Sequence, residues 1–570
     1  MNRVILVAES RSKPKIVASS ARCLENNLHL CGHAPDVIRS AEGLVTAFSH
    51  GDRYLAVEKL KECRGNFWGW FEDQNRLWVF NDRWGSYPIF RGFAKTGDEI
   101  IFGNFSEVLP LLELSIDPRL LVTYLTFGYL PGDDSFFAKI HAIPPGSLIE
   151  FSRGGERLSR YFSFLTSGRL DISPQESRKE LRWRLLSAVA NSIEGFDEIN
   201  ISLSSGVDSR GLLIAALECL PANRIHAFTY GLPGTFDYEL SKKVARQAGV
   251  DLKQHPISIE GYGINEVMDL AKDCGNQIFF LPQPPLKSFE LESLEGMPVL
   301  IGFAGGPVTG SHVWSTFVQG NGRNGWQNRV FDRHAWLPPD LALSCLIDPP
   351  YTADDFRSLL LERYFTDPEG SENWDMVALA DYWDFYHRQR KYNLFCTSKV
   401  RHRQTYIYPF LDPRLAEFLW ALPVQDRLNR SAYLDVLKEL SPRLFEIPTS
   451  RSFGGPVNGK PLTRPVKAVN ALRFWLEHNL FSGNFHFHIN QNYLPFYLYY
   501  NESWEVISYL RAHQPQLKLL NWRQFEVDLE TLDKIPSALK SRRPEMKRIN
   551  AMINLGFSLL LAKKSSVTVE

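Results

Sequence analysis

The feature that most constrains the fold is an alternation of strand and helix patterns in the middle of the chain. An apolar strand pattern at 198–204 is followed by a glycine-containing turn and an apolar helix pattern at 209–220. A second strand and a second helix follow at 224–231 and 238–249, and a long amphipathic helix pattern precedes them at 174–195. Parallel strands need such crossover connections. The region therefore predicts a doubly wound α/β unit built on a parallel sheet.

The N-terminal region has a different pattern, typical of layered antiparallel sheets. Short apolar runs with turn residues near their ends predict strands at 4–8, 53–60, 76–82, 87–93, 99–105 and 147–152. We therefore expect an α+β domain over residues 1–165, followed by the α/β domain over 175–455. Within the latter, 375–440 is mainly helical in pattern. Residues 456–570 form a C-terminal extension of mixed pattern, with an aromatic run at 493–504.

Charge and apolar patterning narrow the possible partners. The 570 residues contain 64 Lys and Arg and 64 Asp and Glu, so the zero net charge gives no overall attraction to nucleic acid or anionic membranes. No run approaches the roughly 20 apolar residues of a membrane span, and the first residues lack a signal-peptide cleavage pattern. The seven cysteines include no CxxC pair. We therefore expect a cytoplasmic protein with free thiols and neither a nucleic-acid nor a membrane partner.

The segment between the first strand and its helix carries the most chemical information. It consists of the residues Leu203, Ser204, Ser205, Gly206, Val207, Asp208, Ser209 and Arg210. A small-residue turn at this place lets backbone N–H groups and the helix N-terminus face an anion, with serine hydroxyls as further donors. Asp208 could then hold Mg²⁺ against phosphates. The Walker A and GxGxxG patterns are absent, and an ordinary strand-to-helix turn with serine caps stays an alternative.

Several motifs, in their order along the chain, resemble the glutamine-hydrolysing asparagine synthetases. Ser204–Ser209 is similar to the SGGxDS loop of the PP-loop ATP pyrophosphatases, with Ser205 in place of the second glycine. The other motifs are 65–69 (GNFWG), 81–90 (NDRWGSYPIF), 105–107 (FSE), 140–146 (IHAIPPG) and 408–413 (YPFLDP). The resemblance covers roughly residues 5–455. It implies an Ntn-hydrolase-like αββα domain, a PP-loop domain and a helical C-terminal extension.

The resemblance also implies a reaction and its ligands. In this family, a substrate carboxylate attacks ATP to form an acyl-adenylate and pyrophosphate, and ammonia or an amine then displaces AMP. ATP and Mg²⁺ would be required, Asp208 would be the metal ligand, and a small-molecule or peptide carboxylate and an amine would be the substrates. A homodimer is possible. Further adenosine contacts would come from Leu203, Tyr230, Ile301 and Gly302, although Tyr230 and Ile301 also fit plain core packing.

Two further departures from the family pattern, and one basic run, concern the second domain. The family motif G-x-G-G-D-E is here Gly302-Phe303-Ala304-Gly305-Gly306-Pro307, so the expected carboxylate pair is replaced. The family lysine has no direct counterpart, and Arg451 is the nearest candidate for the catalytic cation. The basic run 388–391 (RQRK), which resembles a basic helix of the family, is interpreted as a solvated helix face.

The N-terminal domain lacks the expected nucleophile. Family members that hydrolyse glutamine expose a cysteine at position 2, whose thiolate attacks the amide, and this sequence has Asn2 there. We therefore expect no glutamine hydrolysis. Asp82 and Arg83 would keep a structural role in their turn.

Several functions stay open at this point. The first is an ATP-dependent amide ligase, including the intramolecular reactions of β-lactam synthetases and lasso-peptide macrocyclases. The second is a catalytically degenerate relative that binds a nucleotide or a partner protein. A PP-loop enzyme that thiolates nucleic acid is a third, but it would need cysteine pairs and a basic face.

Overall fold

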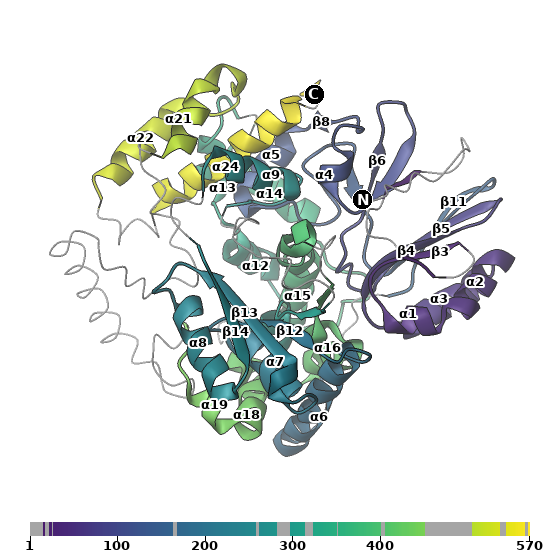
Figure 1. The fold of residues 1–570 in the computed structure, drawn as a ribbon. Helices are drawn as coiled ribbons and strands as arrows, with labels where there is room; N and C mark the ends of the chain where they lie inside the picture. The colour runs from purple at the N-terminus through teal and green to yellow at the C-terminus, as the bar shows by residue number, and fades with distance from the viewer. Residues whose placement is uncertain are drawn as a thin grey trace.

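The computed structural model describes twelve ranges of the chain, and all structural statements concern these residues. They are 15–17, 22–24, 27–162, 168–257, 262–281, 297–313, 323–349, 351–400, 405–450, 504–535, 543–564 and 568–569. Figure 1 shows the N-terminal sheets on one side, the parallel sheet with its helices below, and the C-terminal helices above. The predicted strand at 4–8, Asn2, Arg451 and most of the aromatic run at 493–504 lie outside the described residues.

The N-terminal region contains two sheets. The six-stranded sheet is antiparallel throughout, in the order β11-β10-β5-β4-β3-β2. Its strands are β2 (Arg22–Cys23), β3 (Leu28–His33), β4 (Asn66–Glu72), β5 (Arg76–Asn81), β10 (Ser147–Ser152) and β11 (Gly155–Arg160). The four-stranded sheet has the order β1-β7-β6-β9, with only the β1–β7 pair parallel. Its strands are β1 (Lys15–Val17), β6 (Phe90–Phe93), β7 (Glu99–Phe102) and β9 (His141–Ala142).

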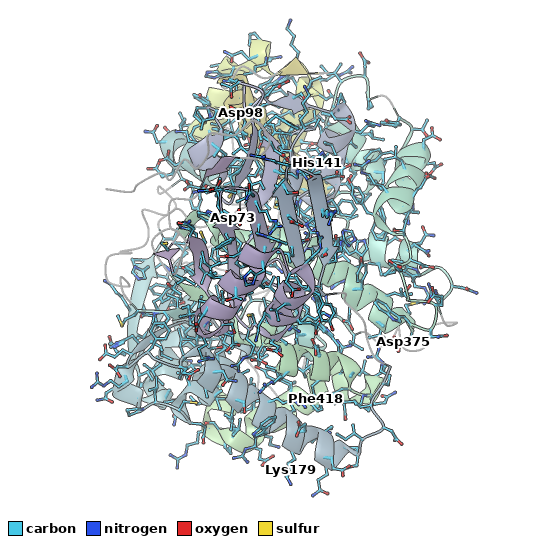
Figure 2. All side chains as sticks on the ribbon, turned by 90° about the vertical axis from the view of Figure 1, so that its right-hand side faces the viewer. Asp73, Asp98, His141, Lys179, Asp375 and Phe418 are labelled. Carbon is cyan, nitrogen blue, oxygen red and sulfur yellow. The ribbon has the colours of Figure 1, made fainter. Side chains whose placement is uncertain are left out.

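Alternating side chains on β4 explain why these sheets form layers. Phe67 and Phe71 pack against three helices, α1 (Pro35–Arg39), α2 (Ala41–His50) and α3 (Arg53–Glu62), whereas Trp68 and Trp70 face the second sheet. The far side of the second sheet packs on α4 (Phe105–Val108) and α5 (Pro118–Phe127). The order is therefore helix, sheet, sheet, helix, as predicted. Figure 2 views this region with Asp73 and His141 toward the reader.

The predicted strand at 53–60 is wrong, because these residues form helix α3. The side chain of Asp52 accepts a hydrogen bond from the Leu55 N–H at 2.9 Å and so caps the helix N-terminus. Ala56 and Leu60 are buried one helical turn apart. The apolar spacing therefore has the period of a helix, and the cap residue just before it is the signal that identifies the helix start.

The parallel sheet confirms the predicted alternation of strands and helices. Its order is β14-β13-β12-β15-β16, and every neighbouring pair is parallel. The strands are β12 (Ile199–Ser202), β13 (Ile225–Gly231), β14 (Asp251–Pro256), β15 (Val299–Leu300) and β16 (Tyr406–Ile407). The predicted helices are α6 (Pro174–Ser192), α7 (Val207–Leu217) and α8 (Phe236–Ala248). A capping box of Ser173 and Glu176 fixes the start of α6.

The region from 375 to 440 is mainly helical, as predicted. It contains α15 (Met376–Trp383), a π-helix (Asp384–Asn393), α16 (Pro413–Ala421), α17 (Val424–Arg427) and α18 (Ser431–Leu440), and α19 (Pro442–Glu446) follows. Other helices include α9 (Ile264–Asp273), α10 (Gly305–Thr309), α12 (Trp326–His334), α13 (Pro339–Ser344) and α14 (Ala353–Tyr364).

The described C-terminal helices share a core with the N-terminal region. They are α21 (Glu505–Ala512), α22 (Trp522–Asp533) and α24 (Pro544–Lys564). Ile553 and Phe557 of α24 belong to the same buried cluster as Leu121 and Leu125 of α5. The last strand, β17 (Thr568–Val569), pairs with β8 (Ser115–Ile116). In the part of the chain described, the helices are all too short or too polar to cross a membrane.

Candidate active site

The predicted phosphate loop joins β12, the middle strand of the parallel sheet, to the start of α7. The Ser204 N–H donates to Ser209 Oγ at 3.0 Å, and the Gly206 N–H donates to Ser204 Oγ at 3.1 Å. The first N–H groups of α7 have no acceptor within the helix and form the positive end of its dipole. This geometry suits an anion. The hydrogen bonds of Ser204 and Ser209 are equally consistent with the alternative, an ordinary strand-to-helix turn capped by serines.

A buried carboxylate holds the loop from the neighbouring helix. Asp237, in the first turn of α8, accepts hydrogen bonds from the Ser205 N–H at 2.8 Å and from Ser205 Oγ at 2.6 Å. Ser205 is fully buried. Burial raises the pKa of Asp237 to about 6, and the two bonds from Ser205 act in the opposite direction. Ser205, which departs from the family glycine, is thus the residue that ties the loop to α8.

The raised pKa makes a measurable prediction about Asp237→Asn. Between pH 4 and 6 the folded protein retains a proton that the unfolded chain releases, so lowering the pH through this range stabilises the wild-type fold. The variant lacks this titration. We expect the urea stability of the wild type relative to Asp237→Asn to rise by about 2 kcal/mol from pH 7.5 to pH 4.5.

An exposed acid provides the control for this measurement. The variant Asp251→Asn, at the start of β14, should follow the wild-type pH profile. If Asp237→Asn also follows the wild-type profile, the side chain titrates as in the unfolded chain and the assignment is incorrect.

Asp208, the predicted metal ligand, forms an ion pair with Arg430. The guanidinium Nη2 of Arg430 donates to Asp208 Oδ1, and its side chain is only 6% exposed. The same guanidinium lies over the ring of Tyr433, 4.8 Å from the ring centroid. Asn429 and Arg430 both have left-handed backbone conformations, with φ of 54° and 63°. The chain thus adopts an uncommon conformation at the point where it brings this cation to the loop.

The glycine segment that replaces the family carboxylates lies directly against Asp208. A Cβ atom added to Gly302 would be 3.1 Å from Asp208 Cβ, and one added to Gly305 would be 3.0 Å from Asp208 Cγ. A Cβ on Gly306 would be 3.7 Å from Asp208 Oδ2. The structure therefore places positions 302–306 beside the loop. It gives them no carboxylate.

Arg210 connects the loop to the segment that precedes Arg451. This fully buried guanidinium donates to the backbone oxygens of Leu444 at 3.1 Å, Ile447 at 2.5 Å and Pro448 at 2.9 Å. Burial lowers the pKa of Arg210 to about 10, so it stays a cation at neutral pH. Arg451 lies outside the described residues, and its assignment as the catalytic cation stays a prediction.

The proposed adenosine contacts divide between two buried clusters. Leu203 and Ile301 are 1% and 8% exposed and belong to the core around the parallel sheet. Tyr230, at the end of β13, is partly buried against the other large core. The structure thus shows the core packing expected as the alternative, while contact with adenosine stays a prediction.

The interpretation of the basic run 388–391 as a solvated face is wrong. Gln389, Arg390 and Lys391 are each 1–2% exposed. They lie on the π-helix and bind the N-terminal domain: Arg390 donates to Asp133 at 2.6 Å, and Lys391 Nζ donates to the Asp134 carbonyl at 2.7 Å. Burial, with Arg390 nearby, lowers the pKa of Lys391 to about 7. The run therefore fastens the two halves of the molecule together.

Asp82 has the structural role that the resemblance implies. Its fully buried carboxylate accepts bonds from the N–H groups of Phe67 at 3.1 Å and Trp84 at 2.9 Å, and from Ser86 Oγ at 2.7 Å. Arg83 in the same turn pairs with Glu417 of α16 at 2.9 Å. The turn is thus a joint between the N-terminal sheets and the second domain.

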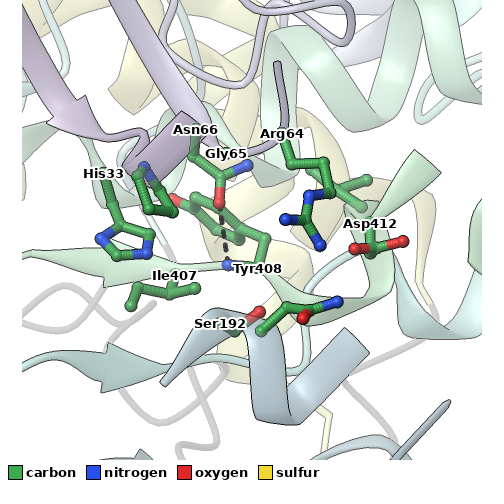
Figure 3. A pocket seen from close by; sticks show the side chains of 11 residues that line it. His33, Arg64, Gly65, Asn66, Ser192, Ile407, Tyr408 and Asp412 are labelled. Atoms are coloured by element: carbon green, nitrogen blue, oxygen red, sulfur yellow. Dashed lines mark hydrogen bonds between the residues drawn. The ribbon is translucent and has the colours of Figure 1, made fainter. Parts of the chain in front are cut away.

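A small cavity lies at the same junction (Figure 3). His33 and Asn66 reach it from β3 and β4, and Ser192, Ile407 and Tyr408 reach it from α6 and the end of β16. The Tyr408 N–H donates to Asn66 Oδ1 at 3.1 Å. The volume of about 30 Å³ suits bound water rather than a substrate.

The sequence motifs did not identify Arg430 or Asp237, and they assigned no role to Arg210. Asp237 and Arg430 contact Ser205 and Asp208 of the loop from other elements. Arg210 contacts the Ser205 carbonyl through its buried guanidinium. Arg210 directly follows the SSGVDS loop, so an arginine inside an otherwise apolar helix was an available signal. Arg430 is 222 positions from Asp208 and had no comparable signal.

Comparison with known proteins supports the predicted relationship. Residues 41–162 match a family described as a glutamine amidotransferase domain. Asparagine synthetase [glutamine-hydrolyzing] 1 of Bacillus subtilis is 21% identical over 258 residues, which cover 43% of this chain. The match spans 38% of that relative's own length.

Two solved structures show weak similarity to this chain. One is an allosteric regulatory enzyme of purine biosynthesis, 12% identical, with 42% of this chain and 62% of that chain covered and a TM-score of 0.17. The other is the glutamine phosphoribosylpyrophosphate amidotransferase of B. subtilis with ADP and GMP, also 12% identical, with 49% and 56% covered and a TM-score of 0.16. At these TM-scores neither likeness supports an argument. The matched amidotransferase domain and the Bacillus subtilis relative show that this chain is related to the asparagine synthetase family.

Proposed function

We propose that the protein is an ATP-dependent amide ligase that activates a carboxylate and transfers the acyl group to ammonia or an amine. One observation carries the proposal: the serine loop stands at the carboxyl end of the middle strand of a five-stranded parallel sheet and opens α7. Ligands of open α/β sheets bind at such ends. The strand order and the family relationship support a nucleotide there.

The proposed reaction has two steps. A carboxylate oxygen attacks the α-phosphorus of ATP, and the bond to the bridging oxygen breaks, so that pyrophosphate leaves with the electron pair. The amine nitrogen then attacks the acyl carbon, the bond to the AMP oxygen breaks, and the nitrogen loses a proton to solvent or to a base. In the first step the first N–H groups of α7 and the hydroxyls of Ser204 and Ser209 would stabilise the phosphate charge.

We also propose that the amine does not come from glutamine hydrolysis within this chain. The first cysteine of the printed sequence is Cys23, which lies on β2 opposite His29. Cys63 is buried, and burial raises its pKa to about 12, so it is a poor source of thiolate. Offering glutamine and ammonium separately in the assay tests this point directly.

The test is formation of AMP and pyrophosphate with candidate carboxylates, first aspartate and then carboxylate peptides. Hydroxylamine serves as the amine, because it yields a coloured hydroxamate. We expect equal amounts of AMP, pyrophosphate and hydroxamate. The double variant Ser204→Ala/Ser209→Ala should lower the rate roughly 10-fold to 100-fold, since each hydroxyl is a donor to charged phosphate.

Ser202→Ala is the matched control, because Ser202 ends β12 just before the loop. It should keep the wild-type rate. ATP-dependent product that is unaffected by the loop variant would contradict the placement of the reaction at this loop.

A second function is favoured by the Asp208–Arg430 ion pair and by the absence of carboxylates at Gly306 and Pro307. Both features weaken a magnesium site, so a relative that binds nucleotide without turnover is the alternative. Nucleotide binding with no AMP from any carboxylate would favour it.

A further inference from the structure

The residues around Asp208 do not fit the Mg²⁺ ion that the family resemblance implies. Mg²⁺ needs near-octahedral oxygen ligands and usually takes one or two carboxylates together with phosphate oxygens and water. Here Asp208 is already paired with Arg430, and the glycines at 305 and 306 beside it carry no side-chain oxygen. Across the described ranges, three or more His, Cys, Asp or Glu side chains never gather closely enough to hold a metal.

We propose that Arg430, in place of a divalent cation, supplies the positive charge that binds nucleotide phosphates at this loop. The inference rests on the proposed nucleotide binding and deepens it. Asp208 would hold the guanidinium in position while the site is empty. Phosphate oxygens would then take over Arg430 when the nucleotide binds.

The state of the Arg430 side chain supports this role. The side chain is only 6% exposed, yet its Nε is a buried donor without a hydrogen-bond partner among the described residues. Stacking on Tyr433 fixes the plane of the guanidinium. A guanidinium offers five N–H donors in a planar fork that matches phosphate oxygens, so Arg430 can bind phosphate through the donor groups that Asp208 leaves unused.

The backbone at Arg430 indicates that the position is built for this contact. Asn429 and Arg430 are two consecutive residues other than glycine with positive φ. Such conformations are uncommon and persist where the surrounding structure enforces them. The Tyr433 hydroxyl, in the first turn of α18, donates to the Val207 carbonyl at 3.3 Å and so joins this corner to the first residue of α7.

The proposal reverses the sign of the expected effect of Asp208→Asn. If Asp208 held Mg²⁺, removing its charge would weaken ATP binding. If Asp208 instead competes with phosphate for Arg430 and repels the phosphate charge, removing its charge should strengthen binding.

The experiment is calorimetric titration of the full-length protein with ATP, once with MgCl₂ and once with EDTA. We expect the affinity in EDTA to stay within about 3-fold of that with magnesium, a difference of under 1 kcal/mol. Asp208→Asn should bind ATP at least as tightly as the wild type. Arg430→Met should bind roughly 10-fold to 100-fold more weakly in both buffers.

Two further variants make the test decisive. Arg443→Met removes an exposed arginine of α19 and should not change ATP affinity. Arg430→Lys keeps the positive charge but lacks the planar guanidinium, so it keeps the charge that pairs with Asp208. Its ATP affinity should lie between those of the wild type and Arg430→Met. The inference is overturned if the wild type binds ATP with MgCl₂ but not with EDTA, and if Asp208→Asn does not bind ATP with MgCl₂. That outcome leaves the proposed function intact. A folded protein that binds no ATP in either buffer overturns both.

Discussion

Replacing Arg427 with methionine is expected to lower the free energy of unfolding by about 3–5 kcal/mol, because it leaves a buried carboxylate without its cation. The side chains of Arg427 and Asp381 are 0% and 3% exposed, and the guanidinium binds both carboxylate oxygens, one of them at 3.1 Å. The Arg427 side chain also reaches the Pro307 carbonyl at 3.5 Å. The measurement is urea unfolding monitored by circular dichroism, from which the midpoint and the slope are obtained.

A double variant separates the ion pair from the rest of the packing. Arg427→Met/Asp381→Leu removes both charges and should recover most of the lost stability, since paired apolar replacements of buried ions are often close to neutral. The exposed pair of Arg182 and Glu439, 3.0 Å apart, provides the surface control, and Arg182→Met should cost less than about 1 kcal/mol. A double variant as unstable as the single variant would show that packing, not the unpaired charge, causes the loss.

The sequence predicted those elements whose signals are local. The strands and helices between 199 and 248 follow from apolar periodicity and from turn residues at their ends, and the structure has them within a few residues. The phosphate loop was found for the same reason, because its small residues lie between one strand and one helix. The strand prediction for helix α3 is wrong although the cap residue Asp52 is visible in the sequence, because a short apolar run does not by itself distinguish a strand from a helix.

The partners that complete the site are distant in sequence, and this is why they could not be predicted. Arg390 is 257 positions from Asp133, and Arg430 is 222 positions from Asp208. A charged run on a helix is interpreted as a solvated face unless its acidic partners are known. Only the tertiary fold shows which acidic residues contact it. The same limit applies to Asp208. Its place in the loop motif predicts a metal ligand, whereas its contact with Arg430 depends on a left-handed backbone conformation that no sequence pattern predicts.

Replacing Trp84 with alanine is expected to lower the free energy of unfolding by about 3–5 kcal/mol, as for other buried aromatic side chains. Trp84 is 2% exposed, and its Nε1 donates to the Leu411 carbonyl at 2.6 Å. Its ring makes edge contacts with Phe385 and Trp420, both with centroids 5.4 Å away. One indole thus joins the N-terminal turn to the π-helix and α16, so its loss should loosen the junction between the domains.

Neighbouring side chains are not expected to move in and fill the space that the Trp84 indole leaves. Trp84 lines a pocket of about 450 Å³, so the space left by the indole would join that pocket. Trp183→Ala is the matched control, because that indole on α6 is 54% exposed and should cost far less. Trp84→Phe should fall between the two, since it keeps a ring but loses the donor to Leu411. Thermal unfolding and limited proteolysis of the three variants measure the effect, and equal behaviour of Trp84→Ala and Trp183→Ala would refute the role given to Trp84 in joining the domains.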